Sequence, residues 1–332
     1  MADARVILQR RPEGQVGIAD FAVVPVEIAP LAAGEALVAP ARISLDPYLA
    51  IQVYGRPVRG VTLEPGEAMR SRMVGTVVES RDPSLAPGDM VRGVGPWQSR
   101  FAIPAAQLER LDTLRDRPEL HLSALGTSGI TAWVGLHRVA RIAPGETLIV
   151  SGATGTIGSI VGQLGRRHGC DVIGIAGGAE KCAHATGALG FERCLDHRSE
   201  SFGESLCGIE AQVHFENVGG ALLDAVLPAI TEHGRIALCG MVAHYDTSRA
   251  HSFRNLHLLL EKVIELRPYR VSEHAASHAE ALRDLRAAVE AGELTCDHTF
   301  ADGLDAAAAG FVSMLQGKAL GKSIVRLDGR EA

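Results

Sequence analysis

The stretch TLIVSGATGTIGSIVGQLG, residues 147–165, constrains the fold more than any other part of the chain. An apolar run leads into a glycine-rich turn, and a helical pattern follows the turn. Ala153, Gly155 and Gly158 occupy the three small positions of a G-x-G-x-x-G fingerprint, with alanine in the first. Small residues there permit a tight turn, close approach of backbone N–H groups to a pyrophosphate, and packing of helix on strand. The stretch therefore predicts a strand, a phosphate-binding turn and a helix.

The next apolar strand, DVIGIAG at 171–177, indicates which cofactor the turn would hold. Folds that bind NAD carry an acidic residue about twenty residues after the glycines, where it contacts the ribose hydroxyls. This chain has AGG at 176–178, followed by Glu180 and Lys181. The missing carboxylate and the nearby cation favour a 2′-phosphate, so the sequence predicts NADPH. The alternative for Lys181 is an ordinary exposed lysine on a helix.

The chain changes its pattern near residue 121, and its 332 residues suffice for two domains. Before that point, short β-branched segments such as EALVAPARISLD and RMVGTVVES are separated by Pro-Gly turns, as in a barrel-like β domain. After it, helical and apolar strand segments alternate, which is typical of a doubly wound parallel sheet. The final segment, GKALGKSIVRL, predicts a strand that rejoins the first domain.

Composition excludes several classes of protein. The net charge of −6 argues against nucleic acid or an anionic membrane surface as a partner. The apolar runs are shorter than the ~18–20 residues that span a bilayer, and the first residues lack a signal-peptide core. The six cysteines form no C-x-x-C pair, and no cysteine or histidine precedes His121. We therefore expect a cytoplasmic protein with no metal site in its first third.

Seven segments, spread over essentially the whole chain, resemble a known family. They are SLDPYL (44–49), GTVVESRDPSLAPGD (75–89), GTSGITAW (126–133), GATGTIGSIVGQLG (152–165), GIAGGAEKC (174–182), FENVGG (215–220) and LGKSIV (320–325). In this order they resemble the zinc-independent medium-chain dehydrogenase/reductases, in the branch of prostaglandin reductase, leukotriene 12-hydroxydehydrogenase and plant double-bond reductases.

The resemblance implies an α/β fold with two domains. A GroES-like β-barrel domain would comprise residues 1–121 and 300–332, and a Rossmann-type doubly wound parallel sheet would comprise residues 122–299. It also implies a homodimer that uses NADPH, without a metal, to reduce a carbon–carbon double bond conjugated to a carbonyl group.

The resemblance assigns cofactor contacts to matching positions. Gly155 and Gly158 would line the pyrophosphate, Lys181 would meet the 2′-phosphate, and Asn217 and Gly240 would lie near the nicotinamide ribose. The complete predicted set is Thr131, Gly152, Thr154, Gly155, Thr156, Ile157, Gly158, Gly178, Lys181, His197, Asn217, Cys239, Gly240, Tyr245 and Tyr269.

The chain also departs from the family pattern. His197 replaces a tyrosine often found beside the 2′-phosphate, although histidine still donates to phosphate, more strongly when protonated. Ala319 replaces the asparagine of a C-terminal N-x-G-K motif, and Ala50 replaces an arginine. Glu261 stands where many members have an active-site tyrosine. The cofactor side thus resembles the family, whereas the substrate side differs.

Three residues are candidates for catalysis: Tyr48, Tyr54 and Glu261. Tyr48 follows a turn at the end of a strand and would face the cleft or pack at the domain interface. Tyr54 lies in a polar loop, where it would be either a lid residue or an exposed aromatic residue. Glu261 falls in FRNLHLLLEKVIEL, a predicted apolar helix, and would be either a desolvated proton donor in the cleft or a solvent-facing glutamate.

The predicted function is NADPH-dependent reduction of the double bond of α,β-unsaturated ketones or aldehydes, with hydride transfer to the β-carbon. One alternative is a biosynthetic reductase in which hydride addition to a polyene or enone triggers ring closure. Another is a non-catalytic NADPH sensor, which the lost tyrosine and asparagine would favour. The product formed, or tight binding without turnover, would distinguish the three.

Overall fold

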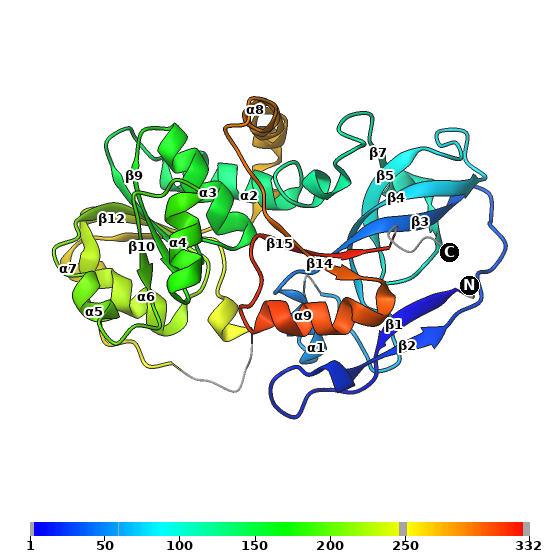
Figure 1. Ribbon diagram of the computed structural model, residues 1–332, viewed down its shortest axis with the longest axis horizontal. Helices are drawn as coiled ribbons and strands as arrows, with labels where there is room; N and C mark the ends of the chain where they lie inside the picture. The colour runs from blue at the N-terminus through cyan, green and yellow to red at the C-terminus, as the bar shows by residue number, and fades with distance from the viewer. Residues whose placement is uncertain (1–2, 59, 246–250, 328–332) are drawn as a thin grey trace. The chain divides into compact units, whose positions relative to one another are not determined.

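The structure is a computed structural model that describes residues 3–58, 60–245 and 251–327 (Figure 1). The chain forms two compact units. Unit 1 comprises Met1–Leu122 and His298–Ala332, and unit 2 comprises Ser123–Asp297. Within the described ranges, no helix has the length and apolar character needed to cross a bilayer.

Unit 1 consists mainly of β-strands. Its largest sheet has the order β14-β15-β3-β4-β5-β7, with β6 also paired to β3, while β1 and β2 form a separate pair. The strands are β1 Ala4–Leu8, β2 Phe21–Pro25, β3 Glu35–Ser44, β4 Arg70–Ser80, β5 Met90–Pro96, β6 Phe101–Pro104, β7 Glu109–Arg110, β14 His298–Asp302 and β15 Lys322–Arg326. The helices are α1 Leu49–Val53 and α9 Ala307–Leu315.

The C-terminal segment completes this sheet, as its sequence predicted. Ile324 of β15 pairs with Ser44 of β3 in antiparallel register. Helix α9 covers the unit through Phe311, whose ring packs edge-on against Trp97 at 5.7 Å. The indole nitrogen of Trp97 in turn donates to Ser71 Oγ at 2.8 Å, so this large buried side chain has its polar atom satisfied.

A buried ion pair joins two of the segments that carry the family resemblance. Lys322 is 2% exposed, and its Nζ donates to Asp46 Oδ1 at 2.5 Å and to the Leu45 carbonyl at 3.0 Å. Ser44 Oγ also donates to the Asp46 carboxylate. Burial raises the pKa of Asp46, but the Lys322 ammonium outweighs it and the net pKa is lowered. The pair fixes the turn that precedes Tyr48.

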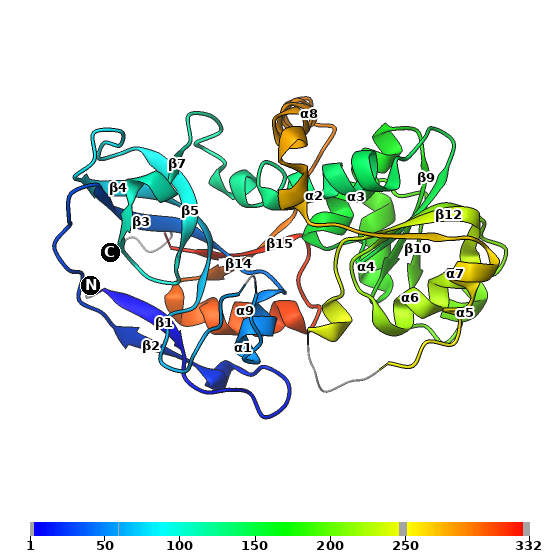
Figure 2. The same ribbon diagram turned by 180° about the vertical axis from the view of Figure 1, so that it is seen from behind.

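Unit 2 contains the predicted parallel sheet, in the order β10-β9-β8-β11-β12-β13 (Figures 1 and 2). The strands are β8 Thr147–Ser151, β9 Asp171–Ala176, β10 Arg193–Asp196, β11 Ala211–Glu216, β12 Ile230–Leu238 and β13 Glu265–Pro268. The helices are α2 Thr127–Val134, continued as a π-helix over Gly135–Ala140, α3 Thr156–Arg167, α4 Ala179–Gly187, α5 Phe202–Ser205, α6 Gly220–Val226, α7 Leu258–Glu261 and α8 His278–Glu290.

This strand order reverses direction between β8 and β11, the first and fourth strands of the sheet in sequence. Ligands of doubly wound sheets bind outside the carboxyl ends of the strands at such a reversal. The sheet is apolar on its helix-covered faces, where Ile149, Ile175 and Ile236 pack with Leu223 and Val226 of α6. The carboxyl edge at β8 and β11 is therefore where a site is expected.

One predicted element was wrong. FRNLHLLLEKVIEL does not form a continuous helix, because only Leu258–Glu261 is helical and Glu265 already belongs to β13. Leu258 and Leu259 pack on the core, whereas Leu260 is 84% exposed. Val263 has a positive φ of 50°, which ends the helix and turns the chain into the strand.

Candidate functional site

The glycine-rich turn joins β8 to α3 at the reversal of the sheet. Gly152 has a φ of +61°, in the left-handed region that favours glycine. A Cβ on Gly158 would lie 2.2 Å from the Gly152 carbonyl oxygen, so this position excludes any larger side chain. Ala153 N donates to Ile175 O at 3.0 Å and ties the turn to the end of β9. The small residues are thus required by the turn itself.

The first turn of α3 is suited to an anion. Its N-cap residue, Gly155, has no side-chain cap, and the first turn contains no acidic residue. The first N–H groups of an α-helix point beyond its N-terminus, and the helix dipole makes this end positive. Thr154, in the same turn, is 3% exposed. A pyrophosphate at this end would accept hydrogen bonds from backbone N–H groups and place negative charge at the positive end of the helix dipole.

Two cationic side chains, Lys181 and Arg198, and the imidazole of His197 meet beside Gly177, just after β9. A Cβ on Gly177 would lie 2.9 Å from both His197 Nε2 and Arg198 Nε, so these two groups converge over the glycine. Lys181 lies close enough that Arg198 lowers the pKa of its ammonium group, after burial as the larger cause. These three side chains, hereafter the cationic cluster, present the positive charges of Lys181 and Arg198 to any bound group, although Glu180 and Asp196 also lie near them.

Asp196 holds the two loops of the cationic cluster together. Its Oδ1 accepts Gly178 N at 2.8 Å and Arg198 N at 2.9 Å. These backbone donors, Arg198 first, lower the pKa of the Asp196 carboxyl group. His197 N donates to Ala176 O at 3.0 Å, so the parallel pairing of β10 with β9 extends to the first residue after β10. The carboxylate is therefore engaged by backbone N–H groups at the base of the cluster.

A buried network crosses the reversal between β8 and β11. Glu216 and His214 are both 0% exposed, and His214 Nε2 lies 2.7 Å from Glu216 Oε2. Glu216 Oε1 accepts Ser151 Oγ at 2.7 Å, Gly219 N at 2.9 Å, and also the N–H of Val218. Burial raises the pKa of Glu216, but His214 and these donors outweigh it and the net pKa is lowered. We call this arrangement the switch-point network.

The switch-point network places Asn217. Asn217 N donates to Ser151 Oγ and Asn217 Nδ2 donates to Ser151 O, both at 2.8 Å. Gly240 N in turn donates to Glu216 O at 3.1 Å, and this hydrogen bond holds the segment after β12 beside the segment that contains Asn217. The structure therefore brings Gly152, Asn217 and Gly240 to one edge of the sheet, and the predicted contact of Asn217 and Gly240 with a nicotinamide ribose stays a prediction.

Two tyrosines and a thiol gather beside Gly240. Tyr269 donates its hydroxyl to Thr131 O at 2.9 Å, and Tyr245 OH lies 3.6 Å from where a Gly240 Cβ would stand. Burial, followed by the influence of Cys239, raises the pKa of both tyrosines. Burial raises the pKa of the Cys239 thiol to about 12. The raised pKa values keep all three groups protonated at neutral pH.

The catalytic candidates lie in different places. In unit 1, Tyr48 is half-buried at the N-cap of α1, and Tyr54 is the residue that ends this helix. The Tyr54 hydroxyl donates to Gly14 O at 3.0 Å, so it anchors the loop before β2. In unit 2, Glu261 is exposed.

Glu261 lies away from the predicted cofactor residues. The adjacent Lys262 donates from Nζ to Ile230 O at 2.8 Å, and Ile230 begins β12. Because the strands are parallel, this is the amino edge of the sheet, opposite the edge that carries Asn217 and Gly240. This placement agrees with the alternative that Glu261 faces the solvent. A catalytic role for Glu261 stays a prediction, and none of the other predicted site residues lies beside it.

Sequence reasoning missed Arg198 and the switch-point network. The signal for Arg198 was its position directly after the Asp196-His197 pair, since an arginine near this strand end accommodates a 2′-phosphate. His214 and Glu216 alternate on one strand, but an apolar strand context gave no reason to expect both inside the core. Their pairing with Ser151 depends on the contact between β8 and β11.

The described ranges contain no group of three or more histidine, cysteine, aspartate or glutamate side chains placed to hold a metal ion. The doubly wound sheet, the glycine-rich turn and the cationic cluster define a dinucleotide-dependent dehydrogenase or reductase.

Comparisons with known proteins identify the family. Family models described as the N-terminal domain of oxidoreductase and as zinc-binding dehydrogenase match residues 4–111 and 156–284. The chain is 35% identical to NADPH-dependent curcumin reductase of Escherichia coli K12, over 98% of this chain and 97% of that protein. It is 30% identical to 2-alkenal reductase (NADP(+)-dependent) of Nicotiana tabacum, over 99% and 98%.

The structure of CurA from Vibrio vulnificus in complex with NADPH is also similar, with a TM-score of 0.92 and 30% identity over 98% of this chain and all of that chain. The chain belongs to the zinc-independent medium-chain dehydrogenase/reductases, in the branch that includes prostaglandin reductase. The predicted fold class, a Rossmann-type sheet with a GroES-like unit, is confirmed.

Proposed function

We propose that this protein uses NADPH to reduce the carbon–carbon double bond of α,β-unsaturated ketones and aldehydes. The protein is an oxidoreductase whose cofactor is NADPH, in keeping with its relatives. The observation that carries the proposal is the cationic cluster beside a glycine-rich turn that is suited to a pyrophosphate. The names of the relatives, a curcumin reductase and a 2-alkenal reductase, support enones and enals as substrates.

The residues of unit 2 fit the cofactor along its length. The N–H groups at the start of α3 would bind the pyrophosphate, and Lys181, His197 and Arg198 would bind the 2′-phosphate. Asn217 and Gly240 would orient the nicotinamide ribose. When bound, NADPH supplies the hydride that conjugate reduction requires. The protein itself contributes the positioning of the cofactor, because hydride transfer needs the hydride donor to be held over the β-carbon of the substrate.

The enolate oxygen that develops during reduction needs a hydrogen-bond donor, and the α-carbon needs a proton. Tyr245 stays protonated because burial raises its pKa, so it would donate a hydrogen bond on the nicotinamide side, whereas the Tyr269 hydroxyl already donates to Thr131 O. Tyr48, held by the turn that Asp46 and Lys322 fix, is our candidate for the substrate side. Tyr54 would donate to a substrate only after its hydroxyl group breaks the hydrogen bond to the Gly14 carbonyl oxygen. The predicted domain division has its boundaries between residues 121 and 122 and between residues 299 and 300. This division, which places Tyr48 in the catalytic domain, remains part of our proposal.

The test is oxidation of NADPH and of NADH by the purified protein with a panel of enones and enals, from short alkenals to diaryl dienones, followed by mass spectrometry of the products. We expect a saturated ketone or aldehyde, two hydrogens heavier than the substrate, with NADPH strongly preferred. A product with a new ring would instead support reduction coupled to cyclisation. Tight NADPH binding with no oxidation across the panel would contradict the proposal.

We also propose that the protein acts as a homodimer in the cytoplasm. Strand β13 is an edge strand of its sheet, and Leu260, Val263 and Leu266 beside it are 84%, 52% and 38% exposed. A second copy that covers this edge would bury these side chains and pair the open strand. Sedimentation should show a dimer that Leu260→Glu weakens, and a monomeric wild-type protein would contradict this arrangement.

A further inference from the structure

Two cysteines meet next to the cationic cluster, where helix α4 packs on strand β10 (Figures 1 and 2). Cys182 lies in the helix and Cys194 in the strand, and both are half-buried thiols that form no disulfide. The two thiols are hydrogen-bonded to one another, and burial, followed by this bond, raises the pKa of the Cys194 thiol. Their sulfur atoms are therefore already in contact in the reduced protein.

The spacing of the backbone explains this contact. Gly178 N, at the start of α4, donates to Asp196 Oδ1 at 2.8 Å and so ties the helix to the end of β10. Cys182 N donates to Gly178 O at 3.2 Å, which places Cys182 one helical turn, about 6 Å, further along the same face. Cys194 lies two residues before Asp196 on the same face of the strand, about 6–7 Å away. Equal steps from one hydrogen bond thus bring the two side chains together.

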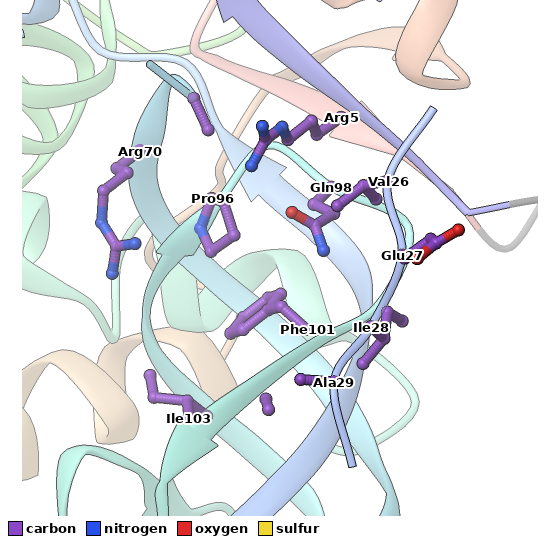
Figure 3. A pocket seen from close by; sticks show the side chains of 12 residues that line it. Arg5, Val26, Glu27, Ile28, Ala29, Arg70, Pro96, Gln98, Phe101 and Ile103 are labelled. Atoms are coloured by element: carbon purple, nitrogen blue, oxygen red, sulfur yellow. The ribbon is translucent and has the colours of Figure 1, made fainter. Parts of the chain in front are cut away.

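The other thiols have different surroundings. Cys170 donates to Ala143 O at 3.5 Å, and the exposed Cys207 donates to Gly203 O at 3.6 Å. All six cysteines belong to unit 2, and the described residues that line the pocket of unit 1 in Figure 3 include neither cysteine nor methionine. An oxidant therefore meets two thiols in contact at α4 and β10, whereas the partner of the Cys207 thiol is a carbonyl oxygen.

We propose that Cys182 and Cys194 form a peroxide-sensitive thiol pair that oxidises reversibly to a disulfide. Because the thiolate is the reacting form, the raised pKa of Cys194 makes Cys182 the thiol that attacks the peroxide first. One peroxide oxygen is transferred to the Cys182 sulfur, which becomes a sulfenic acid, and water is released. Cys194 Sγ then attacks this sulfur, and the hydroxyl group leaves with the Cys194 proton as a second water. The peroxide gains the two electrons that the thiols lose, and a dithiol reductant reverses the reaction.

The disulfide would act on the cationic cluster, because both cysteines are close to it in the chain. Lys181 directly precedes Cys182, and Arg198 follows Cys194 by four residues. A sulfur–sulfur bond is about 2.05 Å long, which is shorter than any contact between two thiols, so oxidation draws α4 towards β10. Lys181 and Arg198 then change their separation, and we expect weaker binding of the 2′-phosphate. This effect rests on the proposed cofactor contacts, whereas formation of the disulfide does not.

The first test is treatment of the purified full-length protein with hydrogen peroxide, followed by alkylation of free thiols and mass spectrometry of the peptides. We expect a linked pair of peptides that contain Cys182 and Cys194, lighter by two hydrogen atoms, and its reversal by dithiothreitol. Cys194→Ser should stop at a Cys182 sulfenic acid that dimedone traps, and Cys207→Ser, at an exposed thiol, should leave the disulfide unchanged. Alkylation of both thiols after peroxide treatment, or linkage of either to another cysteine, would overturn the proposal.

The second test measures the affinities for NADPH and NADH by calorimetry, before oxidation and after oxidation and removal of the peroxide. We expect NADPH binding to weaken about three- to tenfold and NADH binding to stay constant, because a charge-assisted contact to the 2′-phosphate is disturbed. Peroxide-treated Cys182→Ser should keep the affinity of the reduced protein. A disulfide that leaves NADPH affinity unchanged would refute its action on the cluster. Equal affinities for the two cofactors in the reduced protein would instead refute the proposed 2′-phosphate contacts, and the peptide analysis would still decide the disulfide.

Discussion

The switch-point network and the cationic cluster lie on the same edge of one sheet, yet they are built in opposite ways. Glu216 and His214 are fully buried and paired, and the Glu216 carboxylate accepts hydrogen bonds from Ser151, Val218 and Gly219. Lys181 is half-buried, while His197 and Arg198 are exposed, and the charge of Arg198 lowers the pKa of both Lys181 and His197.

This difference separates two tasks of a cofactor site. A buried, saturated network fixes the backbone, because removing any member leaves a polar group without a partner in a low-dielectric interior. An exposed group of like charges contributes little to folding, but gains attraction when an anion arrives. Changes in the first region should therefore alter stability, and changes in the second should alter cofactor choice.

The largest expected effect is on the switch-point network. Glu216→Ala should lower the free energy of unfolding by about 3–5 kcal/mol, because His214 and two backbone N–H groups lose their buried partner. Denaturant unfolding monitored by circular dichroism measures this. Glu216→Gln retains the acceptor oxygen and should cost only about 1 kcal/mol. Glu261→Gln, at an exposed glutamate, is the matched control and should change stability by less than about 0.5 kcal/mol.

The second effect concerns the glycine-rich turn. Gly158→Ala should destabilise the protein by about 1–3 kcal/mol, since the new Cβ would stand 2.2 Å from the Gly152 oxygen and the turn must shift. NADPH affinity, measured by fluorescence quenching, should fall in parallel. Gly187→Ala, at the end of α4 with no atom within 4 Å of the added Cβ, should be neutral or stabilising. Equal effects of both substitutions would show that the turn tolerates a side chain.

The third effect tests the cationic cluster. Lys181→Ala and Arg198→Ala should each reduce the preference for NADPH over NADH by about tenfold or more, because each removes a charge-assisted contact to the 2′-phosphate. The readout is kcat/KM with each cofactor, and the melting temperature should stay near that of the wild type. Arg193→Ala, at the other end of β10, should leave the preference intact. A drop in stability without a change of preference would reverse the contrast between the two regions.

The smallest effect is a pH dependence. Burial, followed by Arg198, lowers the pKa of His197, which favours the neutral imidazole when no cofactor is bound. A bound 2′-phosphate favours the imidazolium and raises that pKa, so binding takes up a proton. NADPH should therefore bind a few-fold more tightly at about pH 6 than at about pH 8. His197→Tyr should lose this difference in calorimetry, and an unchanged pH profile would remove His197 from the cluster.

Local patterns in the sequence were sufficient for the parallel sheet, the glycine-rich turn and the choice of NADPH. Small residues at 153, 155 and 158 act through the backbone of one short segment, so their spacing alone predicts the turn. The alternation of strands and helices likewise depends on local periodicity. The helix predicted around Glu261 was wrong because an apolar run is ambiguous between a short helix and a strand.

Tertiary structure decided the rest, because the deciding contacts join residues far apart in the chain. Lys322 meets Asp46 across 276 residues, and Ser151 meets Glu216 across 65. Arg198 joins the cluster only because β10 lies beside β9, and Tyr54 is engaged only because its hydroxyl reaches Gly14 O. Burial and partner are properties of position in space, so a single sequence shows which residues can bind or donate, while packing determines which of them meet.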